Sequence, residues 1–280
     1  MLAPQLQHEL YKLFARRRTY IGFGAFLVLQ GLILALLQHP KAKGQINSLL
    51  TQNGLDFSLH YQGLTLAIVI IAFSFTFLGG LYVALVAGDI VAKEVEEGTM
   101  RMVLARPVSR TRLLLIKLAA CAIYTLALVT FLGTSALLLA AAYRGGFGHL
   151  FIFIPDEDLF AFYATGEGLL RYAGSVLALA FGTLTITCMA FMFSCFKMKP
   201  AAATILTLSV FFIDAILTNL PYFRDLRHVF MSYHIGGWVR LYHDHPPWAS
   251  LARSFLILLT LQTTFTLVGI THFRLRDLKG

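Results

Sequence analysis

The sequence predicts an all-α integral membrane protein with six transmembrane helices, organised as one transmembrane domain over residues 1–280. The chain is 58% hydrophobic and only 13% charged, and its mean hydropathy is +0.72. Soluble domains carry about one quarter charged residues. Several apolar runs reach the ~20 residues that a helix needs to cross a bilayer. These runs are continuous rather than alternating, which favours helices over the strands of a barrel.

The formal net charge is +9. In a soluble protein this excess would suggest a nucleic-acid partner. In a membrane protein, basic residues instead set the orientation of the helices in the lipid bilayer, so we expect no nucleic acid. The three cysteines lie inside apolar runs, with the spacing of neither a disulfide framework nor a metal site. They are Cys121, Cys188 and Cys195.

Residues 1–18 are predicted to form an amphipathic helix that lies in the membrane interface. Apolar residues recur there at helical spacing, namely Leu2, Leu6, Leu10, Leu13 and Phe14. Polar residues occupy the positions between them: Gln5, Gln7, His8, Glu9, Lys12 and Arg16. We expect the arginines at 16–18 to hold this end on the cytoplasmic side. A cleaved signal peptide is not expected, because residues 38–40 are Gln-His-Pro rather than small residues.

Six spans are expected, at about 19–37, 64–87, 113–142, 172–196, 201–220 and 251–273. With the N-terminus inside, the inner segments hold 15 lysines and arginines and the outer segments hold eight. Because positive residues favour the cytoplasmic side, both termini are predicted to be cytoplasmic. The expected location is a bacterial cytoplasmic (inner) membrane.

Three further features refine this topology. The second span carries Gly80, Ala84 and Gly88, small residues that let another helix approach in a packed or dimeric interface. Only residues 197–200 separate the fourth and fifth spans, which predicts an antiparallel helical hairpin. The outer segments 144–171 and 221–249 are predicted to be partly helical, interfacial caps.

The most informative stretch is residues 88–117, which we call the charged segment. It holds ten charged residues between two apolar runs: Asp89, Lys93, Glu94, Glu96, Glu97, Arg101, Arg106, Arg110, Arg112 and Lys117. Gly98 is expected to end the helix of the second span. Thr99 and Ser109 are then expected to cap a short connector helix and the third span, respectively. Pro107 prevents the connector helix from continuing.

The connector helix is expected at residues 100–105. Its apolar residues are Met100, Met102, Val103 and Leu104. A solvated loop has no need of such residues, whereas a helix that docks on a partner does. The segment is therefore interpreted as a docking surface on the cytoplasmic side.

The charged segment resembles the membrane subunits of ATP-binding-cassette exporters of the ABC-2 class. The pattern is E-x-E-x-G-T, then a proline eight residues after the threonine, then x-x-R and later K. Here its members are Glu94, Glu96, Gly98, Thr99, Pro107, Arg110 and Lys117. The closing residues 273–279, FRLRDLK, also look like that family's C-terminal end. Elsewhere the resemblance extends only to topology.

The resemblance implies a permease that forms a dimer, with a second copy or a paralogue, on two ATPase subunits. ATP and magnesium would bind the ATPase partner. The chain has no GxxxxGK[ST] phosphate loop, so no cofactor or enzymatic activity is expected of it. The implied ATPase-coupling residues are Glu94, Glu96, Gly98, Thr99, Met100, Arg101, Met102, Val103, Leu104, Pro107, Arg110 and Lys117.

The cargo is open. Apolar spans with few internal charges favour an amphiphilic or hydrophobic cargo over a small ion. A role without export, in which the complex transmits a mechanical change to an extracytoplasmic partner, is also open.

Two other classes compete with this interpretation. An ion-coupled secondary transporter would need ionisable residues at mid-membrane, and Asp214 is the acid that lies well inside a span. Whether it serves in the transport pathway or is an interfacial acid that meets water or the neighbouring Asn219 is left open. An intramembrane CAAX-like protease would use Glu96, Glu97 and His234, which match EExxxR and FxxxH patterns. The predicted topology puts the glutamates and the histidine on opposite sides of a ~30 Å hydrocarbon core.

Two charged outer motifs suggest ion sites only weakly. His243 and His245 flank Asp244, but without a third ligand cluster a solvated loop is the better interpretation. The acidic run at 156–158 lacks the spacing of a calcium loop. No metal site is therefore predicted.

Overall fold

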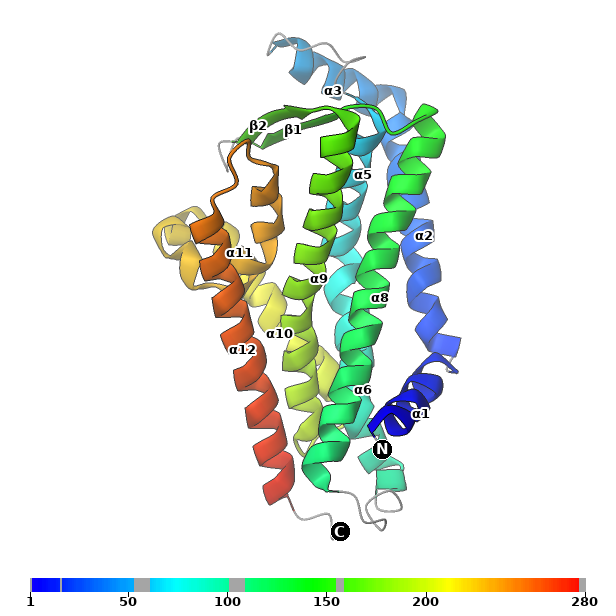
Figure 1. Ribbon diagram of the computed structural model, residues 1–280, viewed down its shortest axis with the longest axis vertical. Coiled ribbons are helices and arrows are strands. Elements are labelled where there is room, and N and C mark those ends of the chain that lie inside the picture. Colours follow the sequence, from blue (N-terminus) through cyan, green and yellow to red (C-terminus); the bar gives the residue numbers. More distant parts are fainter. Residues whose placement is uncertain (1, 16, 53–60, 101–108, 155–158, 277–280) are drawn as a thin grey trace.

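The computed structural model describes residues 2–15, 17–52, 61–100, 109–154 and 159–276. These residues form a long helical bundle with a two-stranded hairpin at one end (Figure 1). Six helices are long and apolar enough to cross a membrane, which confirms the predicted number. They are Thr19–Gln38, Gly63–Glu96, Arg110–Arg144, Thr165–Cys195, Pro200–Asn219 and Trp248–Leu275.

The spans differ in length, and this difference bears on how the bundle sits in a membrane. The first and fifth spans have 20 residues each, while the third has 35. At 1.5 Å per residue, 20 residues cover ~30 Å, the thickness of the hydrocarbon core, and 35 residues cover ~50 Å. The longest helices must therefore tilt, bend or project beyond the hydrocarbon.

The second span consists of three consecutive elements. These are α5 (Gly63–Ser74), a π-helical turn η1 (Phe75–Gly79) and α6 (Gly80–Glu96). A Cβ atom at Gly79 would overlap the ring of Phe75, so glycine is required where the ring lies across the wide turn. Helix α6 continues to Glu96, which carries the span well past its predicted end at residue 87.

Helix α9 (Thr165–Cys195) lies in the middle of the bundle (Figure 1). It packs against α6 and against three further helices, namely α8 (Arg110–Arg144), α10 (Pro200–Asn219) and α12 (Trp248–Leu275). Its buried polar side chains are hydrogen-bonded, as buried polar groups must be. For example, the hydroxyls of Thr125 in α8 and Thr187 in α9 lie 2.8 Å apart.

The small residues of the second span produce the close helix approach that the sequence predicted. A Cβ atom at Gly88 would lie 2.7 Å from Oγ1 of Thr204, and one at Gly80 would lie 3.0 Å from the ring of Phe211. Both neighbours belong to α10 of the same chain. The stripe is therefore a packing surface between α6 and α10 within one chain.

The turn between α9 and α10 is as short as predicted. Helix α9 ends at Cys195, and Lys199 adopts an extended conformation directly before Pro200. Because a residue before proline disfavours the helical conformation, the chain must turn here. The two helices form an antiparallel hairpin.

The outer segment 144–171 is partly helical, because α9 begins at Thr165, but its central part contains two strands that were not predicted. Strands β1 (Leu150–Ile154) and β2 (Leu159–Tyr163) pair antiparallel, with Phe151 opposite Phe162. Strand β2 alternates between buried and exposed residues, with Leu159, Ala161 and Tyr163 turned inward, as expected of a strand with one covered face. In β1, the first three residues, Leu150 to Ile152, are all buried. The acidic run 156–158 lies outside the described residues.

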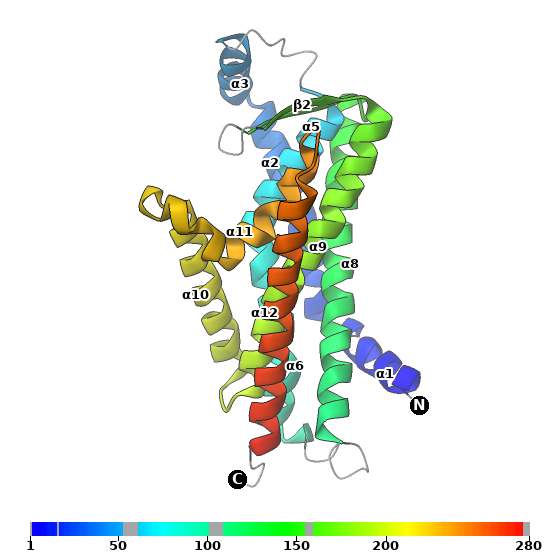
Figure 2. The ribbon, with the colours of Figure 1, turned by 60° about the vertical axis from the view of Figure 1, so that its left-hand side comes forward.

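The second outer segment is partly helical, as predicted. It consists of the 3-10 helix η3 (Pro221–Val229), α11 (Met231–Ile235) and the 3-10 helix η4 (Gly236–Tyr242). Figure 2 shows the gold-coloured η3 extending sideways from the upper end of α10. A further outer helix, α3 (Pro40–Gln52), was not predicted.

The N-terminal helix α1 (Leu2–Phe14) precedes α2 (Arg17–Gln38). The predicted amphipathic pattern is present in part, because Leu13 is buried while Gln7 and His8 are exposed, although Glu9 of the predicted polar face is buried. The Thr19 hydroxyl donates to the Leu13 carbonyl (2.6 Å) across the turn between the two helices. Helix α1 and the C-terminal end of α12 lie at the same end of the bundle (Figure 1).

Candidate functional site

The candidate site lies where the second span leaves the bundle, at the end that also holds α1. Helix α6 ends at Glu96, and Gly98 has a positive φ of 73°. Residues with a side chain rarely adopt this conformation, so glycine is required at this break. The Ser109 hydroxyl accepts a hydrogen bond from the Arg112 amide (3.3 Å), which confirms its predicted role as the cap of α8.

Thr99 is helical, and its hydroxyl donates to the Glu94 carbonyl (3.2 Å) in the last turn of α6. The backbone amides that it was predicted to cap lie outside the described residues. Gly98, in the left-handed conformation, occupies the preceding position. Thr99 therefore fastens the start of the connector to α6.

Four charged side chains meet between α1, α6 and α8, and we call them the ionic cluster: Glu9, Lys12, Glu94 and Lys117. The Lys117 ammonium donates to Glu9 (2.8 Å) and to Glu94 (2.8 Å). Lys12 forms a second ion pair with Glu94. With two acids and two bases, the cluster is electrically balanced.

The ionic cluster is buried at its centre. Lys117 has no exposed surface and Glu94 is 2% exposed. Burying a charge is costly unless an opposite charge and hydrogen bonds compensate for it. Each of the three elements therefore supplies partners to the other two: without α1, Lys117 would lose Glu9 and Glu94 would lose Lys12.

A second set of contacts joins the remaining helix ends. The Arg110 guanidinium donates to the carbonyls of Arg274 (3.2 Å) and Arg276 (3.0 Å), at the end of α12. Arg276 donates to the carbonyl of Phe196 (3.1 Å), in the turn between α9 and α10. These bonds join the start of α8 to the ends of α9 and α12.

A buried serine links α6 to the central helix. The Ser194 hydroxyl of α9 accepts from the backbone amides of Val91 (3.0 Å) and Ala92 (2.9 Å). Movement of the last turns of α6 would break these bonds. Helix α6 is therefore coupled to α9 as well as to α1 and α8.

The predicted coupling residues fall into four groups. Glu94, Met100 and Lys117 are buried, whereas Glu96 is exposed. Gly98, Thr99 and Arg110 shape or fasten the ends of the connector. The rest lie outside the described residues: Arg101, Met102, Val103, Leu104 and Pro107.

Sequence reasoning missed the roles of Glu9 and Lys12, which were assigned only to the polar face of α1. A signal was present for Glu9. It lies three residues after Leu6 and four before Leu13, so it belongs to the face that turns toward the bundle. An acid on such a face needs a buried partner.

The residues that a membrane protease would require are not together. Glu96 and Glu97 are exposed at the end of α6, while His234 lies in α11, toward the other end of the bundle (Figure 1). The His234 ring bonds the Ser254 hydroxyl (3.0 Å) and the His228 carbonyl (2.9 Å). Within the described ranges, no group of three or more histidine, cysteine or acidic side chains could hold a metal ion.

The acid that a secondary transporter would require has a structural partner. The Asp214 carboxylate accepts hydrogen bonds from the backbone amides of Met231 (3.0 Å) and Ser232 (2.6 Å), at the start of α11. The Asn219 amide, the expected neighbour, donates to the Ala215 carbonyl instead. Asp214 therefore fixes the outer segment on α10.

The outer motif around Asp244 is likewise part of the fold. The Tyr163 hydroxyl donates to the Asp244 carboxylate (2.9 Å). The Arg171 guanidinium, paired with Glu167 (2.8 Å), donates to the His243 carbonyl (2.7 Å). These bonds attach the end of η4 to the hairpin and to α9.

Six apolar spans, an interfacial helix and a charged connector at one end of the bundle define a multi-pass membrane protein of the transport type. The chain matches the family model described as ABC-2 family transporter protein over residues 6–278. It therefore belongs to the ABC-2 transporter family and is a permease-type membrane component. No curated protein matched the chain.

Proposed function

We propose that the chain forms the membrane pathway of an ATP-driven exporter and couples to a separate ATPase subunit at the connector between α6 and α8. Two ATPase subunits and a second permease, a copy or a paralogue, would complete the complex. The observation that carries the proposal is the ionic cluster, because it joins both ends of the connector to α1. ATP and magnesium would bind the ATPase.

The geometry suggests how force would pass from the partner into the membrane. Glu94 lies two residues before the end of α6, and Lys117 lies two turns into α8. A push on the connector would therefore move α6 and α8 together rather than separately. The ATPase drives transport only if its states favour different arrangements of the spans, and this link would transmit that preference from the connector to both helices.

The orientation follows from charge. Lysine and arginine are concentrated at the end that holds α1, the connector and the end of α12, and positive residues favour the cytoplasmic side. The ATPase would dock at this end, in the cytoplasm of a bacterial-type cell. The exposed glutamates at the end of α6 would meet it first.

Labelling tests the orientation. The three native cysteines are buried, so a Glu97→Cys variant presents one accessible thiol. In intact cells, a membrane-impermeant maleimide should leave this thiol unlabelled until the membrane is opened. Cysteine at His245, exposed in the loop after η4, should react without opening. Labelling of position 97 from outside would refute the orientation.

Photo-crosslinking tests the coupling. A photoreactive amino acid at Glu97, in the full chain in its native membrane, should yield an adduct with a protein that carries a Walker phosphate-binding motif. The same amino acid at Tyr222 is the control and should not. The additional change Glu96→Lys should reduce the yield, because it reverses an exposed charge at the proposed contact. Adducts with lipid alone would count against the proposal.

A further inference from the structure

We propose that a pocket between η3 and α11 binds a phosphate-bearing anionic group, supplied by the headgroup of a membrane lipid at the outer surface of the bilayer. The pocket has a volume of about 440 Å³, within the range of small-ligand sites. Its lining includes Asn219, Arg224, Arg227, Ser232 and Tyr233. This proposal does not depend on the ATPase coupling proposed above.

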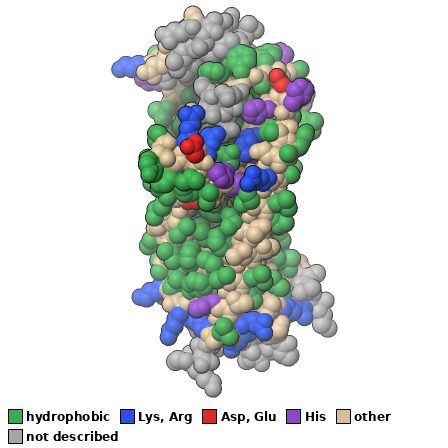
Figure 3. All heavy atoms as spheres, turned by 90° about the vertical axis from the view of Figure 1, so that its left-hand side faces the viewer, with side chains coloured by type: hydrophobic (Ala, Val, Ile, Leu, Met, Phe, Trp, Pro, Cys, Tyr) green, Lys and Arg blue, Asp and Glu red, His purple; other side chains and the backbone are tan. Residues whose placement is uncertain are grey.

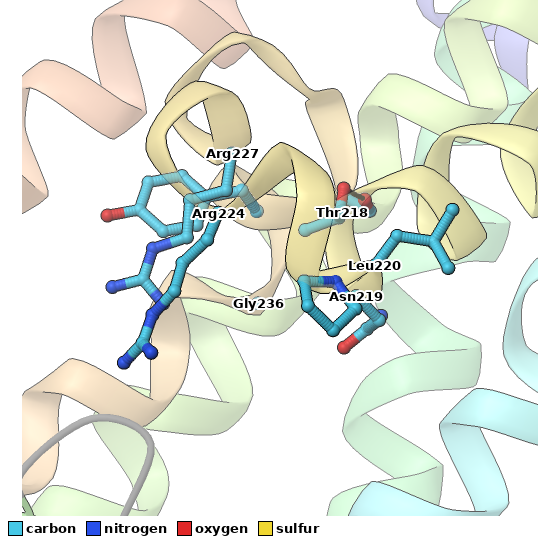
Figure 4. Close-up of a pocket in the computed structure, with 9 residues that line it drawn as sticks. Thr218, Asn219, Leu220, Arg224, Arg227 and Gly236 are labelled. Carbon is cyan, nitrogen blue, oxygen red and sulfur yellow. Dashed lines mark hydrogen bonds between the residues drawn. The ribbon is translucent and has the colours of Figure 1, made fainter.

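The chemistry of the lining selects an anion. The pocket is lined by two arginines and by no acidic side chain. Within the described part of the chain, neither arginine forms an ion pair with an acid. Figure 4 shows both arginine side chains extending in the same direction, on the side of the pocket away from Leu220. Guanidinium groups present paired N–H donors that match phosphate oxygens.

Aromatic contacts stabilise the positive charge of this region. The Arg227 guanidinium lies 5.4 Å from the centre of the Tyr233 ring, and that of Arg240 lies 4.1 Å from it. Such cation–π contacts hold guanidinium groups in place without neutralising them. The charge of Arg227 therefore remains available for an anionic ligand.

The depth of the pocket favours a lipid over a free anion. Helix α10 has 20 residues, enough to cross the ~30 Å hydrocarbon core, and the pocket begins at its last turn. Exposed apolar side chains continue on η3, namely Tyr222, Leu226 and Val229. Figure 3 shows a hydrophobic belt below an upper group of charged side chains on this face. The pocket thus lies at the level of lipid phosphates.

A binding titration of the purified full-length protein in a neutral detergent tests the proposal. The probe is short-chain phosphatidylglycerol, and short-chain phosphatidylcholine reports whether the net negative charge matters. Native mass spectrometry would count bound lipid. We expect the double variant Arg224→Gln/Arg227→Gln to bind phosphatidylglycerol at least tenfold more weakly, because it loses two charge-assisted contacts.

The matched control removes two positive charges elsewhere on the outer half, in Arg253→Gln/Lys41→Gln, and should bind within twofold of the unmodified chain. Arg224 is exposed and Arg227 only half-buried, so the test variant should retain its thermal midpoint. Equal binding by test and control variants would overturn the proposal. Displacement of the lipid by millimolar inorganic phosphate would overturn the lipid assignment in favour of a free-anion site.

Discussion

Lys117 of α8 and Glu94 of α6 form a buried ion pair, with 2.8 Å between the ammonium nitrogen and the carboxylate oxygen. The pair joins the two helices that flank the connector, and Glu9 extends it to the interfacial helix. Part of the charged segment, residues 88–117, is thus buried inside the helical bundle. Its buried members hold the helices together, and its exposed members, such as Glu96, remain free for a partner.

The first prediction concerns the stability of this pair. Lys117→Met should strongly destabilise the protein, by roughly 3–5 kcal/mol, because it leaves Glu94 and Glu9 with an uncompensated buried charge. Thermal unfolding in detergent, followed by size-exclusion chromatography, measures the loss. Lys93→Met is the matched control. It removes a lysine whose pair with Glu97 (3.7 Å) is half-exposed, so it should cost no more than ~1 kcal/mol.

The triple variant Glu9→Gln/Glu94→Gln/Lys117→Met distinguishes a charge effect from a packing effect. The variant neutralises the three buried members of the ionic cluster and keeps Lys12, whose side chain is 36% exposed. Replacing buried charged partners together by neutral side chains is often nearly neutral, so stability should recover in part. An equal loss in the single and triple variants would contradict the argument.

The six spans could be predicted because each is a long apolar run. A segment inside lipid must satisfy its own backbone hydrogen bonds, and a helix does so. The hairpin β1–β2 could not be predicted in the same way. Its strands have five residues each, and a short apolar run fits a strand or a helix equally well. The pairing of the two strands, for example Phe151 opposite Phe162, shows that these runs are strands. That pairing depends on the tertiary structure.

The candidate site was predicted in composition but not in geometry. The sequence identifies Glu94 and Lys117 as members of one charged segment. It does not specify how α6 and α8 are rotated about their axes, and that rotation decides whether the two residues face each other or a partner. Arg110 shows the same limit, because its partner carbonyls lie at the end of α12, far along the chain.

The second prediction concerns Arg110. Arg110→Gln should release the last turn of α12, because a charged donor is lost from the carbonyls of Arg274 and Arg276. A partly exposed, charge-assisted bond of this kind is worth ~1.5 kcal/mol, which corresponds to roughly tenfold faster amide exchange. Hydrogen exchange with mass spectrometry would measure it in a peptide that contains residues 270–276.

The matched control is Lys197→Gln, an exposed base at the same end of the bundle. It should leave the exchange of this peptide unchanged. If Arg110→Gln also leaves it unchanged, the contact with α12 has no role in holding that helix.

The third prediction concerns pH and follows from His234 in α11. Burial lowers the pKa of His234, and the positive charges of Arg240 and Arg253 act in the same direction, against a raising effect of the bond to the His228 carbonyl. As the pH falls below ~6.5, the unfolded chain binds a proton that the folded protein resists. The free energy of unfolding should therefore fall with decreasing pH, by up to ~1.4 kcal/mol per pH unit for this one group.

Unfolding measured between pH 7.5 and 5 in His234→Asn checks this sign. The variant should show a shallower loss of stability on acidification, since it has no imidazole to protonate at that buried position. His245→Asn removes an exposed histidine of the same outer segment and should retain the slope of the unmodified chain. The same slope in His234→Asn would mean that another group controls the acid sensitivity, and that burial near Arg240 and Arg253 does not keep the His234 ring neutral.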